Sequence, residues 1–361
     1  MDRMSHTLSI EHVSKHYGAV AALDDVSLQV NRGQFVTLLG PSGSGKTTLL
    51  MAIAGFVAPN AGSISLDGQP IDHLPPEKRN FGMVFQGYAL FPHLSVFENI
   101  AFPLRVRRRA KAEIEKSVRQ ALDIVQLSGL AERMPNQLSG GQQQRAALAR
   151  ALVFEPNLVL LDEPLSALDK NLRSDLQIEL KDLHRRVGLT FIYVTHDQQE
   201  ALSMSDEIAI LRDGKLVQRG TPKQLYEQPA SRFAADFLGR SNFLRGEVEN
   251  VAAEGFSYRC GPHALVQNGA AEKPAPRGKV IVTLRPEKIR ILDGNETAAN
   301  RVTGRVASWR YLGDDYHILV DVEGVGRLSV MAPTWRREAP AEGSQIALGW
   351  DADASIAVRD D

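Results

Sequence analysis

The sequence lacks three features that would assign it to a special class of protein. It has one cysteine, Cys260, so no intrachain disulfide can form. It has no stretch of about 20 apolar residues, the length that a membrane-spanning helix requires. Its first residues also lack the apolar run of a secretory signal. We therefore expect the chain to act in the cytosol.

An excess of charge of one sign is absent as well. The 361 residues include 42 lysines and arginines and 43 aspartates and glutamates, which gives a net charge of −1. Nucleic-acid-binding domains usually carry a strong positive charge, so this balance argues against a nucleic acid as partner. The composition, with 43% hydrophobic and 24% charged residues, is typical of a globular chain. The length favours one large and one smaller domain.

The first two thirds of the chain alternate short apolar runs with helical stretches, as parallel α/β sheets do. Four apolar runs rich in branched residues predict buried strands of one central sheet, at residues 36–39, 158–161, 191–194 and 208–211. Stretches 110–125 and 141–154 carry apolar residues at helical spacing. We therefore predict an α/β domain over residues 1–238 that contains a helical subdomain at about 87–155.

After about residue 239 the helical spacing gives way to short alternating runs separated by glycines. These runs predict strands at residues 279–284, 317–322, 327–331, 345–350 and 355–358. The stretch 266–277, which is rich in Ala, Pro and Gly, predicts a mobile loop. We interpret residues 239–361 as a small all-β barrel.

A glycine-rich stretch between a predicted strand and a predicted helix fits the P-loop template G-x-x-x-x-G-K-[ST]. Its backbone N–H groups and the positive end of the helix are suited to phosphate oxygens. Lys46 is expected to neutralise the β and γ phosphates, and Thr47 to offer its hydroxyl to Mg²⁺. The expected nucleotide-binding residues are Gly40, Pro41, Ser42, Gly43, Ser44, Gly45, Lys46, Thr47 and Thr48.

Polar residues follow two other predicted strands at the edge where open α/β sheets bind ligands. Asp162 can hold Mg²⁺ directly or through water, and Glu163 can polarise an attacking water as a general base. His196 can donate a hydrogen bond to the γ-phosphate. The alternatives are an incidental surface acid pair and a structural histidine. The place of these residues at strand ends favours the catalytic interpretation.

Residues 138–145, Leu-Ser-Gly-Gly-Gln-Gln-Gln-Arg, resemble the signature motif of the ABC ATPase family. The order of motifs is also that of the family: P-loop, Gln86, signature, the acid pair, residues 166–169 (Ser-Ala-Leu-Asp) and His196. The resemblance implies a P-loop NTPase fold that binds and hydrolyses ATP with Mg²⁺. It further implies that Tyr17 stacks on adenine and that Gln86 senses Mg²⁺ and the attacking water. A packed core tyrosine is the alternative for Tyr17.

The family resemblance also implies that the active site is shared between two subunits. Segment 166–169 would link the two sites, and the signature would close on the ATP held by the partner in a head-to-tail dimer. The residues expected to do so are Ser139, Gly140, Gly141 and Gln142. The stretch 86–96 would transmit motion to a membrane subunit. Tyr88, Leu90 and Phe91 are its expected exposed anchors, unless the helical subdomain buries them.

Residues 284–291 resemble the accessory OB-like (TOBE) domain of bacterial importer ATPases, which favours import over export. Residues 236–244 and 168–173 resemble most the polyamine branch, which imports spermidine and putrescine. Iron, sulfate, phosphonate and sugar import remain open. The implied partners are a second ATPase subunit (an identical copy or a paralogue), two membrane-spanning permease subunits and, indirectly, an extracytoplasmic solute-binding protein. The implied location is the cytoplasmic face of the inner membrane.

Two rival functions use related folds. ABC ATPases of DNA repair insert long coiled coils before the signature, but the interval 87–137 is too short for them and lacks heptads. Alternatively, the barrel could be an oligonucleotide-binding OB fold with stacking aromatics at Trp309, Tyr311, Tyr316 and Trp335. Because net positive charge is missing, a regulatory or dimer-stabilising role is favoured.

Overall fold

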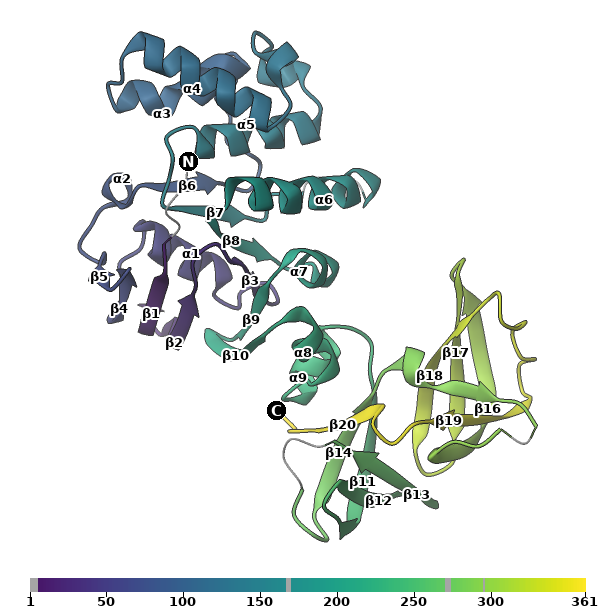
Figure 1. Cartoon of the computed structure of the whole chain (residues 1–361). Helices are drawn as coiled ribbons and strands as arrows, with labels where there is room; N and C mark the ends of the chain where they lie inside the picture. The colour runs from purple at the N-terminus through teal and green to yellow at the C-terminus, as the bar shows by residue number, and fades with distance from the viewer. Residues whose placement is uncertain (1–5, 167–169, 270–273, 295) are drawn as a thin grey trace. The chain divides into compact units, whose positions relative to one another are not determined.

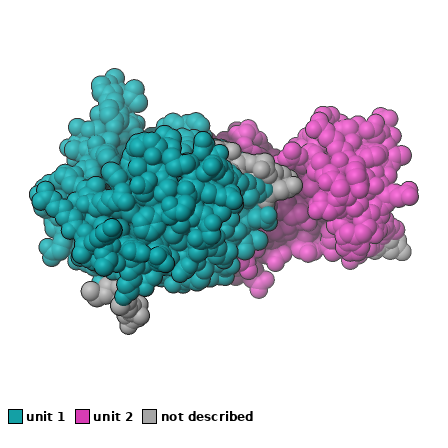
Figure 2. All heavy atoms as spheres, turned by 90° about the horizontal axis from the view of Figure 1, so that it is seen from above, with its two compact units in different colours: residues 1–222 teal, residues 223–361 magenta. Residues whose placement is uncertain are grey.

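The chain folds into two compact units, Met1–Pro222 and Lys223–Asp361 (Figure 2). The computed structural model describes residues 6–166, 170–269, 274–294 and 296–361. The division between the units falls before Leu238, and the domain boundary after that residue stays a prediction, as does the extent of the helical subdomain. Within the described ranges, no helix is both long enough and apolar enough to span a membrane.

Unit 1 is built on a six-stranded sheet in the order β10-β9-β3-β8-β7-β6 (Figure 1). The strands are β3 (Phe35–Leu39), β6 (Phe81–Val84), β7 (Leu158–Asp162), β8 (Thr190–Thr195), β9 (Glu207–Arg212) and β10 (Lys215–Gly220). All neighbours are parallel except β10, which runs antiparallel to β9. The four predicted central strands are confirmed as the adjacent β9, β3, β8 and β7. Every residue of β3, β7 and β8 is buried, as expected for a sheet covered on both faces.

A second sheet of unit 1 is antiparallel, in the order β2-β1-β4-β5. Its strands are β1 (Leu8–Tyr17), β2 (Val20–Val30), β4 (Ala61–Leu66) and β5 (Gln69–Pro70). One apolar core joins this sheet, helix α1 (Lys46–Ala54) and one side of the central sheet. A second core joins the central sheet to helices α5 (Gly140–Leu152) and α6 (Lys170–Val187). The central sheet is therefore held between two apolar layers.

The helices of unit 1 are α1 (Lys46–Ala54), α2 (Pro76–Arg79), α3 (Val96–Val106), α4 (Lys111–Ile124), α5 (Gly140–Leu152), α6 (Lys170–Val187) and α7 (Gln198–Met204), with 3₁₀ turns at Ser128–Leu130 and Pro135–Gln137. The helices predicted over 110–125 and 141–154 are α4 and α5. Together with α3 they form a separate helical layer with its own core (Figure 1).

Unit 2 begins with two short helices and continues as two antiparallel sheets around one core. The helices are α8 (Pro222–Glu227), which starts at the last residue of unit 1, and α9 (Arg232–Phe237). One sheet has the order β13-β12-β11-β14-β20, with β11 (Asn242–Val251), β12 (Gly255–Cys260), β13 (His263–Asn268), β14 (Lys279–Leu284) and β20 (Ser355–Val358). The other has the order β15-β19-β16-β17-β18, with β15 (Arg290–Leu292), β16 (Asn300–Tyr311), β17 (Asp315–Val322), β18 (Gly326–Pro333) and β19 (Gln345–Trp350), and a 3₁₀ turn spans Pro286–Lys288.

All five strands predicted in the C-terminal part are confirmed. The loop predicted over 266–277 is wrong at its start, because residues 266–268 belong to β13 and pair with β12. The side chain of Gln267 is fully buried there. Residues 270–273 of the same stretch lie outside the described residues.

Candidate active site

The predicted phosphate loop connects β3 to α1 as expected, and close backbone approaches explain two of its glycines. A Cβ atom on Gly40 would lie 2.3 Å from the carbonyl oxygen of Leu211, and one on Gly45 would lie 2.4 Å from that of Ala22. Gly45 also has a φ of +99°, which side chains disfavour. Glycine at these positions lets the loop pack against neighbouring strands while α1 begins at Lys46.

Lys46 is buried and is held by the loop itself. Its Nζ donates hydrogen bonds of 2.8 Å to the carbonyl oxygens of Gly40 and Pro41. Burial lowers the pKa of Lys46, although Glu163 and Asp162 partly oppose that effect. The hydroxyl of Ser44 is also buried, and it lacks a hydrogen-bond partner within the described part of the chain. A ligand with several acceptor oxygens, such as a triphosphate, fits these donors.

Asp162 lies at the end of β7, opposite the first turn of α1. Its Oδ1 accepts a hydrogen bond of 3.4 Å from the Thr47 hydroxyl. Burial and the neighbouring Glu163 raise the pKa of Asp162, and Thr47 and Lys46 partly counter this rise. Within the described ranges, no three His, Cys, Asp or Glu side chains are grouped as a metal cluster. One carboxylate and one hydroxyl are nevertheless the oxygen donors with which proteins hold Mg²⁺ on a nucleotide, so the two residues fit that ion.

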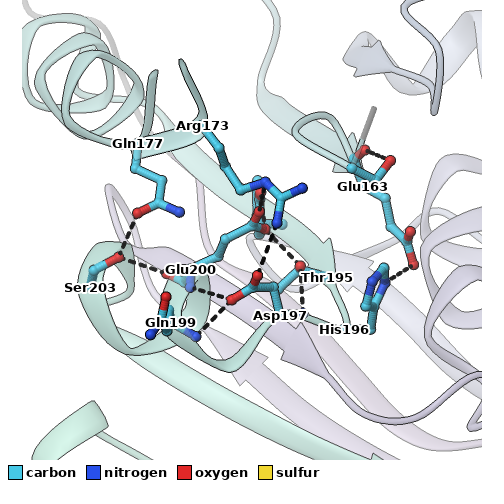
Figure 3. A network of polar contacts seen from close by, with 11 residues as sticks. Glu163, Arg173, Gln177, Thr195, His196, Asp197, Gln199, Glu200 and Ser203 are labelled. Atoms are coloured by element: carbon cyan, nitrogen blue, oxygen red, sulfur yellow. Dashed lines mark hydrogen bonds and ion pairs between the residues drawn. The ribbon is translucent and has the colours of Figure 1, made fainter. Parts of the chain in front are cut away.

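Glu163 and His196 meet across the ends of β7 and β8 (Figure 3). The Nδ1 of His196 lies 3.2 Å from Oε1 of Glu163, whose side chain is 19% exposed. The backbone of Glu163 has a φ of +45°, uncommon for a residue other than glycine. Its N–H donates to Val194, and its carbonyl oxygen accepts from the amide and hydroxyl of Ser166. These bonds fix the turn that directs Glu163 toward His196.

Gln86 follows β6, the neighbour of β7, and its side chain is exposed. Because Val84 pairs with Leu161, Gln86 leaves the sheet at the same edge as Asp162. The fold thus brings Gln86, the phosphate loop, the acid pair and His196 to the carboxyl ends of parallel strands. Their assignments to ATP and Mg²⁺, including that of Thr48 on α1, stay predictions.

The signature residues lie at the start of α5. The Ser139 hydroxyl accepts from the N–H of Gln142, and Oε1 of Gln142 accepts from the N–H of Ser139, so the two form a capping box. A Cβ atom on Gly141 would approach Leu176 of α6 to 3.2 Å. Among the described residues, no hydrogen bond or ion pair joins Ser139–Gln142 to the phosphate loop. Within the part of the chain that the structure describes, such contacts therefore do not join the two predicted halves of the nucleotide site.

Tyr17, at the end of β1, is 52% exposed, with Nζ of Lys15 5.3 Å from its ring centre. A packed core tyrosine is thus excluded, and stacking on adenine stays a prediction. In the linking segment, Ser166 is described, whereas residues 167–169 lie outside the described residues.

The expectation of three exposed anchors after Gln86 is wrong. Tyr88 is 6% exposed and packs in the core beneath α5, and Leu90 and Phe91 are half-buried. The alternative of burial therefore holds for Tyr88. Arg150 of α5 also binds the backbone of this turn. Its guanidinium donates to the carbonyl oxygens of Tyr88 and Ala89 at 2.9 and 2.8 Å.

Sequence reasoning missed a buried polar cluster behind His196. Glu200 of α7 is 2% exposed and accepts hydrogen bonds from Tyr193 and Thr195 of β8. The local sequence instead favours a surface role for Glu200, because Asp197 and Glu200 have the spacing of the two residues of a helix capping box. Asp197 does cap α7, whereas Glu200 turns into the core.

Comparisons with known proteins agree with this geometry. A family model described as ABC transporter matches residues 23–166, and a model described as TOBE domain matches residues 282–358. The chain is 47% identical to a spermidine/putrescine import ATP-binding protein, PotA, of Pseudomonas aeruginosa (strain UCBPP-PA14), over 98% of both chains. It is 49% identical to a PotA of Thermotoga maritima over 79% of this chain and 77% of that protein.

Among solved structures, the chain is similar to the bacterial ABC transporter cassette MJ0796. The match has 34% sequence identity and a TM-score of 0.53, and it covers 60% of this chain and 98% of the cassette. One such structure is dimeric, and another is a dimeric post-hydrolysis state bound to ADP and Pi. The match thus spans nearly the whole cassette but only part of this chain.

Proposed function

Because the chain belongs to the family of ABC transporter ATP-binding proteins, we propose that it energises the import of spermidine and putrescine. As a member of this family it binds and hydrolyses ATP. The observation that carries the proposed solute is the near-complete match to relatives named for spermidine/putrescine import, at 47% identity across both domains. The ATPase itself is not expected to touch the solute.

The phosphate loop supports the placing of ATP. Lys46 would leave the carbonyl oxygens of Gly40 and Pro41 and donate to phosphate oxygens instead. Thr47 and Asp162, already in contact, would hold Mg²⁺, which neutralises charge on the phosphates when it is bound. The N–H groups in the first turn of α1 lack partners within the helix and complete the anion site.

Glu163 and His196 support a defined route for the proton. The carboxylate of Glu163 would accept a proton from the attacking water as general base. His196, 3.2 Å away, limits the positions that this carboxylate can adopt and leaves its other ring nitrogen for the γ-phosphate. Gln86, at the same sheet edge, would orient the water.

The signature residues support a head-to-tail homodimer. Ser139–Gln142 form the N-terminus of α5, which is suited to anions. In the described ranges, no hydrogen bond or ion pair joins these residues to the chain's own phosphate loop. A second copy would place its signature over the ATP of the first. The complete transporter would add two permease subunits and, indirectly, an extracytoplasmic solute-binding protein. The ATPase would then lie at the cytoplasmic face of the cell membrane.

Two measurements test this proposal. The first is Mg²⁺-dependent ATP hydrolysis by the purified chain over a range of protein concentrations. Activity should rise faster than linearly, and Glu163→Gln should lower it about a hundred- to ten-thousandfold. Ser139→Arg should abolish it, whereas Gln120→Arg, which adds the same charge on an exposed face of α4, should not. Linear activity that survives Ser139→Arg would contradict a shared site.

The second measurement identifies the solute. Cells that lack the gene for this chain should lose uptake of labelled spermidine and putrescine, and the wild-type gene but not Glu163→Gln should restore it. Uptake of iron, sulfate, phosphonate and sugar serves as the comparison. Loss of one of these in place of polyamine uptake would replace the proposed solute and leave the ATPase assignment intact.

A further inference from the structure

Behind the site lies a buried carboxylate with an unusual set of partners. Both hydroxyls that reach Glu200 donate to the same oxygen, Oε2: Tyr193 at 2.6 Å and Thr195 at 2.7 Å. The other oxygen, Oε1, lies 3.9 Å from Nε of Arg173 on the first turn of α6. Figure 3 shows that Glu200 reaches toward Arg173 from the opposite helix, α7. A single side chain thus contacts β8 and α6.

A buried carboxylate charge raises the free energy of the folded state unless hydrogen-bond and ion-pair partners compensate it. Glu200 is 2% exposed, so its carboxylate has lost nearly all contact with water. The two hydroxyls and the guanidinium supply the missing interactions, and removal of one partner of a buried ion pair leaves the other uncompensated. The end of β8 and the start of α6 are therefore fixed relative to each other by this cluster.

The same cluster holds both residues that flank His196. The hydroxyl of Thr195 binds Glu200 and accepts the N–H of Asp197 at 3.0 Å. Oδ2 of Asp197 lies 3.3 Å from Nη1 of Arg173, and its Oδ1 caps α7. His196, which is 57% exposed, therefore lies between two residues whose side chains are both bonded within the cluster.

We propose that Glu200 is a positioning residue, which acts through Arg173 and Thr195 to tie the start of α6 to His196 and thereby to keep His196 in contact with Glu163. The proposal rests on the proposed function, in which Glu163 is the general base. Helix α6, which carries Arg173, starts at Lys170.

The matched control is another ion pair between α6 and the sheet. Nζ of Lys181 lies 2.7 Å from Oδ1 of Asp206, on the segment that leads into β9. Lys181 stands about two turns further along α6 than Arg173, on the part of the helix that lies away from His196. Lys181→Gln therefore perturbs the attachment of α6 but leaves the cluster intact.

The test compares kcat and KM for ATP in the full-length chain. Glu200→Gln keeps the size of the side chain but removes its charge, and it should lower kcat about tenfold while KM changes less than about twofold. Arg173→Met, at a side chain that is 28% exposed, should have the same effect and provides a second variant if Glu200→Gln fails to fold. Arg173→Lys, which keeps the charge, should recover part of kcat, and Lys181→Gln should leave kcat unchanged.

The decisive measurement is made in a His196→Ala background. If Glu200 acts through His196, adding Glu200→Gln there should cause no further loss of kcat, because residues that act as a unit are not additive. A further loss of about tenfold in that background would overturn the proposal, as would wild-type kcat in Glu200→Gln. Full activity of Glu163→Gln would instead overturn the proposed catalytic assignment on which this inference rests.

Discussion

Two glycines of the phosphate loop provide a sharp test of the packing described above. Gly43 and Gly45 both have positive φ angles, +79° and +99°. An added Cβ atom at Gly43 would meet no atom within 4 Å, whereas at Gly45 it would lie 2.4 Å from the backbone oxygen of Ala22. Alanine at Gly43 should therefore cost only the strained backbone conformation, about 1–2 kcal/mol. Alanine at Gly45 should add an overlap of about 1–3 kcal/mol, for a total of about 2–5 kcal/mol.

The assay is urea unfolding, with a separate probe for each unit. All three tryptophans, Trp309, Trp335 and Trp350, belong to unit 2, so their fluorescence follows that unit alone. The helical circular dichroism signal comes mainly from unit 1. Both variants should shift the dichroism midpoint without changing the fluorescence midpoint, and Gly45→Ala should shift it further. Equal shifts for the two variants would refute the argument from the Ala22 contact.

Three further predictions concern side chains of unit 1. Tyr88→Phe should change the free energy of unfolding by less than about 1 kcal/mol, or stabilise the chain, since the buried hydroxyl of Tyr88 has no partner in the described ranges; urea unfolding checks this. Arg150→Met should cost about 2 kcal/mol by the same assay, because two carbonyl oxygens lose a charged donor. Burial raises the pKa of Asp206, but Lys181 and the Phe35 N–H outweigh it, so the net pKa is lowered. The destabilisation caused by Lys181→Gln should therefore be present above about pH 4 and disappear as the pH falls below it, as unfolding at a series of pH values would show.

The reacting residues could be predicted because their signals are local. Asp162 is the last residue of one short buried strand and His196 follows the last residue of another, so both are found at the end of a mainly apolar run. The parallel order of the strands then brings these ends to one edge. The first strand, β1, was not predicted because its local sequence signal is irregular. Its register shifts between Ile10 and Val13, and His12 has a φ of +53°, so the alternation that identifies a strand is broken.

Tertiary contacts decided the features that sequence reasoning could not supply. Glu200 satisfies a capping pattern in the sequence, yet hydroxyls contributed by β8 compete for it and bind it. Tyr88 lies in a short stretch that shows neither helical nor strand alternation, yet it is buried, and Arg150, far along the chain, binds its carbonyl oxygen. In both cases the contact depends on the tertiary fold, and the local sequence carries no periodic pattern that predicts it.

The turn after Gln86 shows how such contacts connect the helical layer to the rest of unit 1. Asn99 of α3 accepts the N–H of Phe91 and donates to the carbonyl oxygens of Phe91 and Leu94, and Arg150 of α5 holds Tyr88. The turn is thus bonded to the helical layer, while the ring of Tyr88 packs in the core that includes the central sheet. Gly87 begins this turn with a φ of +77°, and a Cβ atom added there would meet no described atom within 4 Å, so its glycine is required by the backbone conformation and not by packing. The turn beside Gln86 therefore connects the helical layer to the central sheet, through hydrogen bonds on one side and the buried ring of Tyr88 on the other.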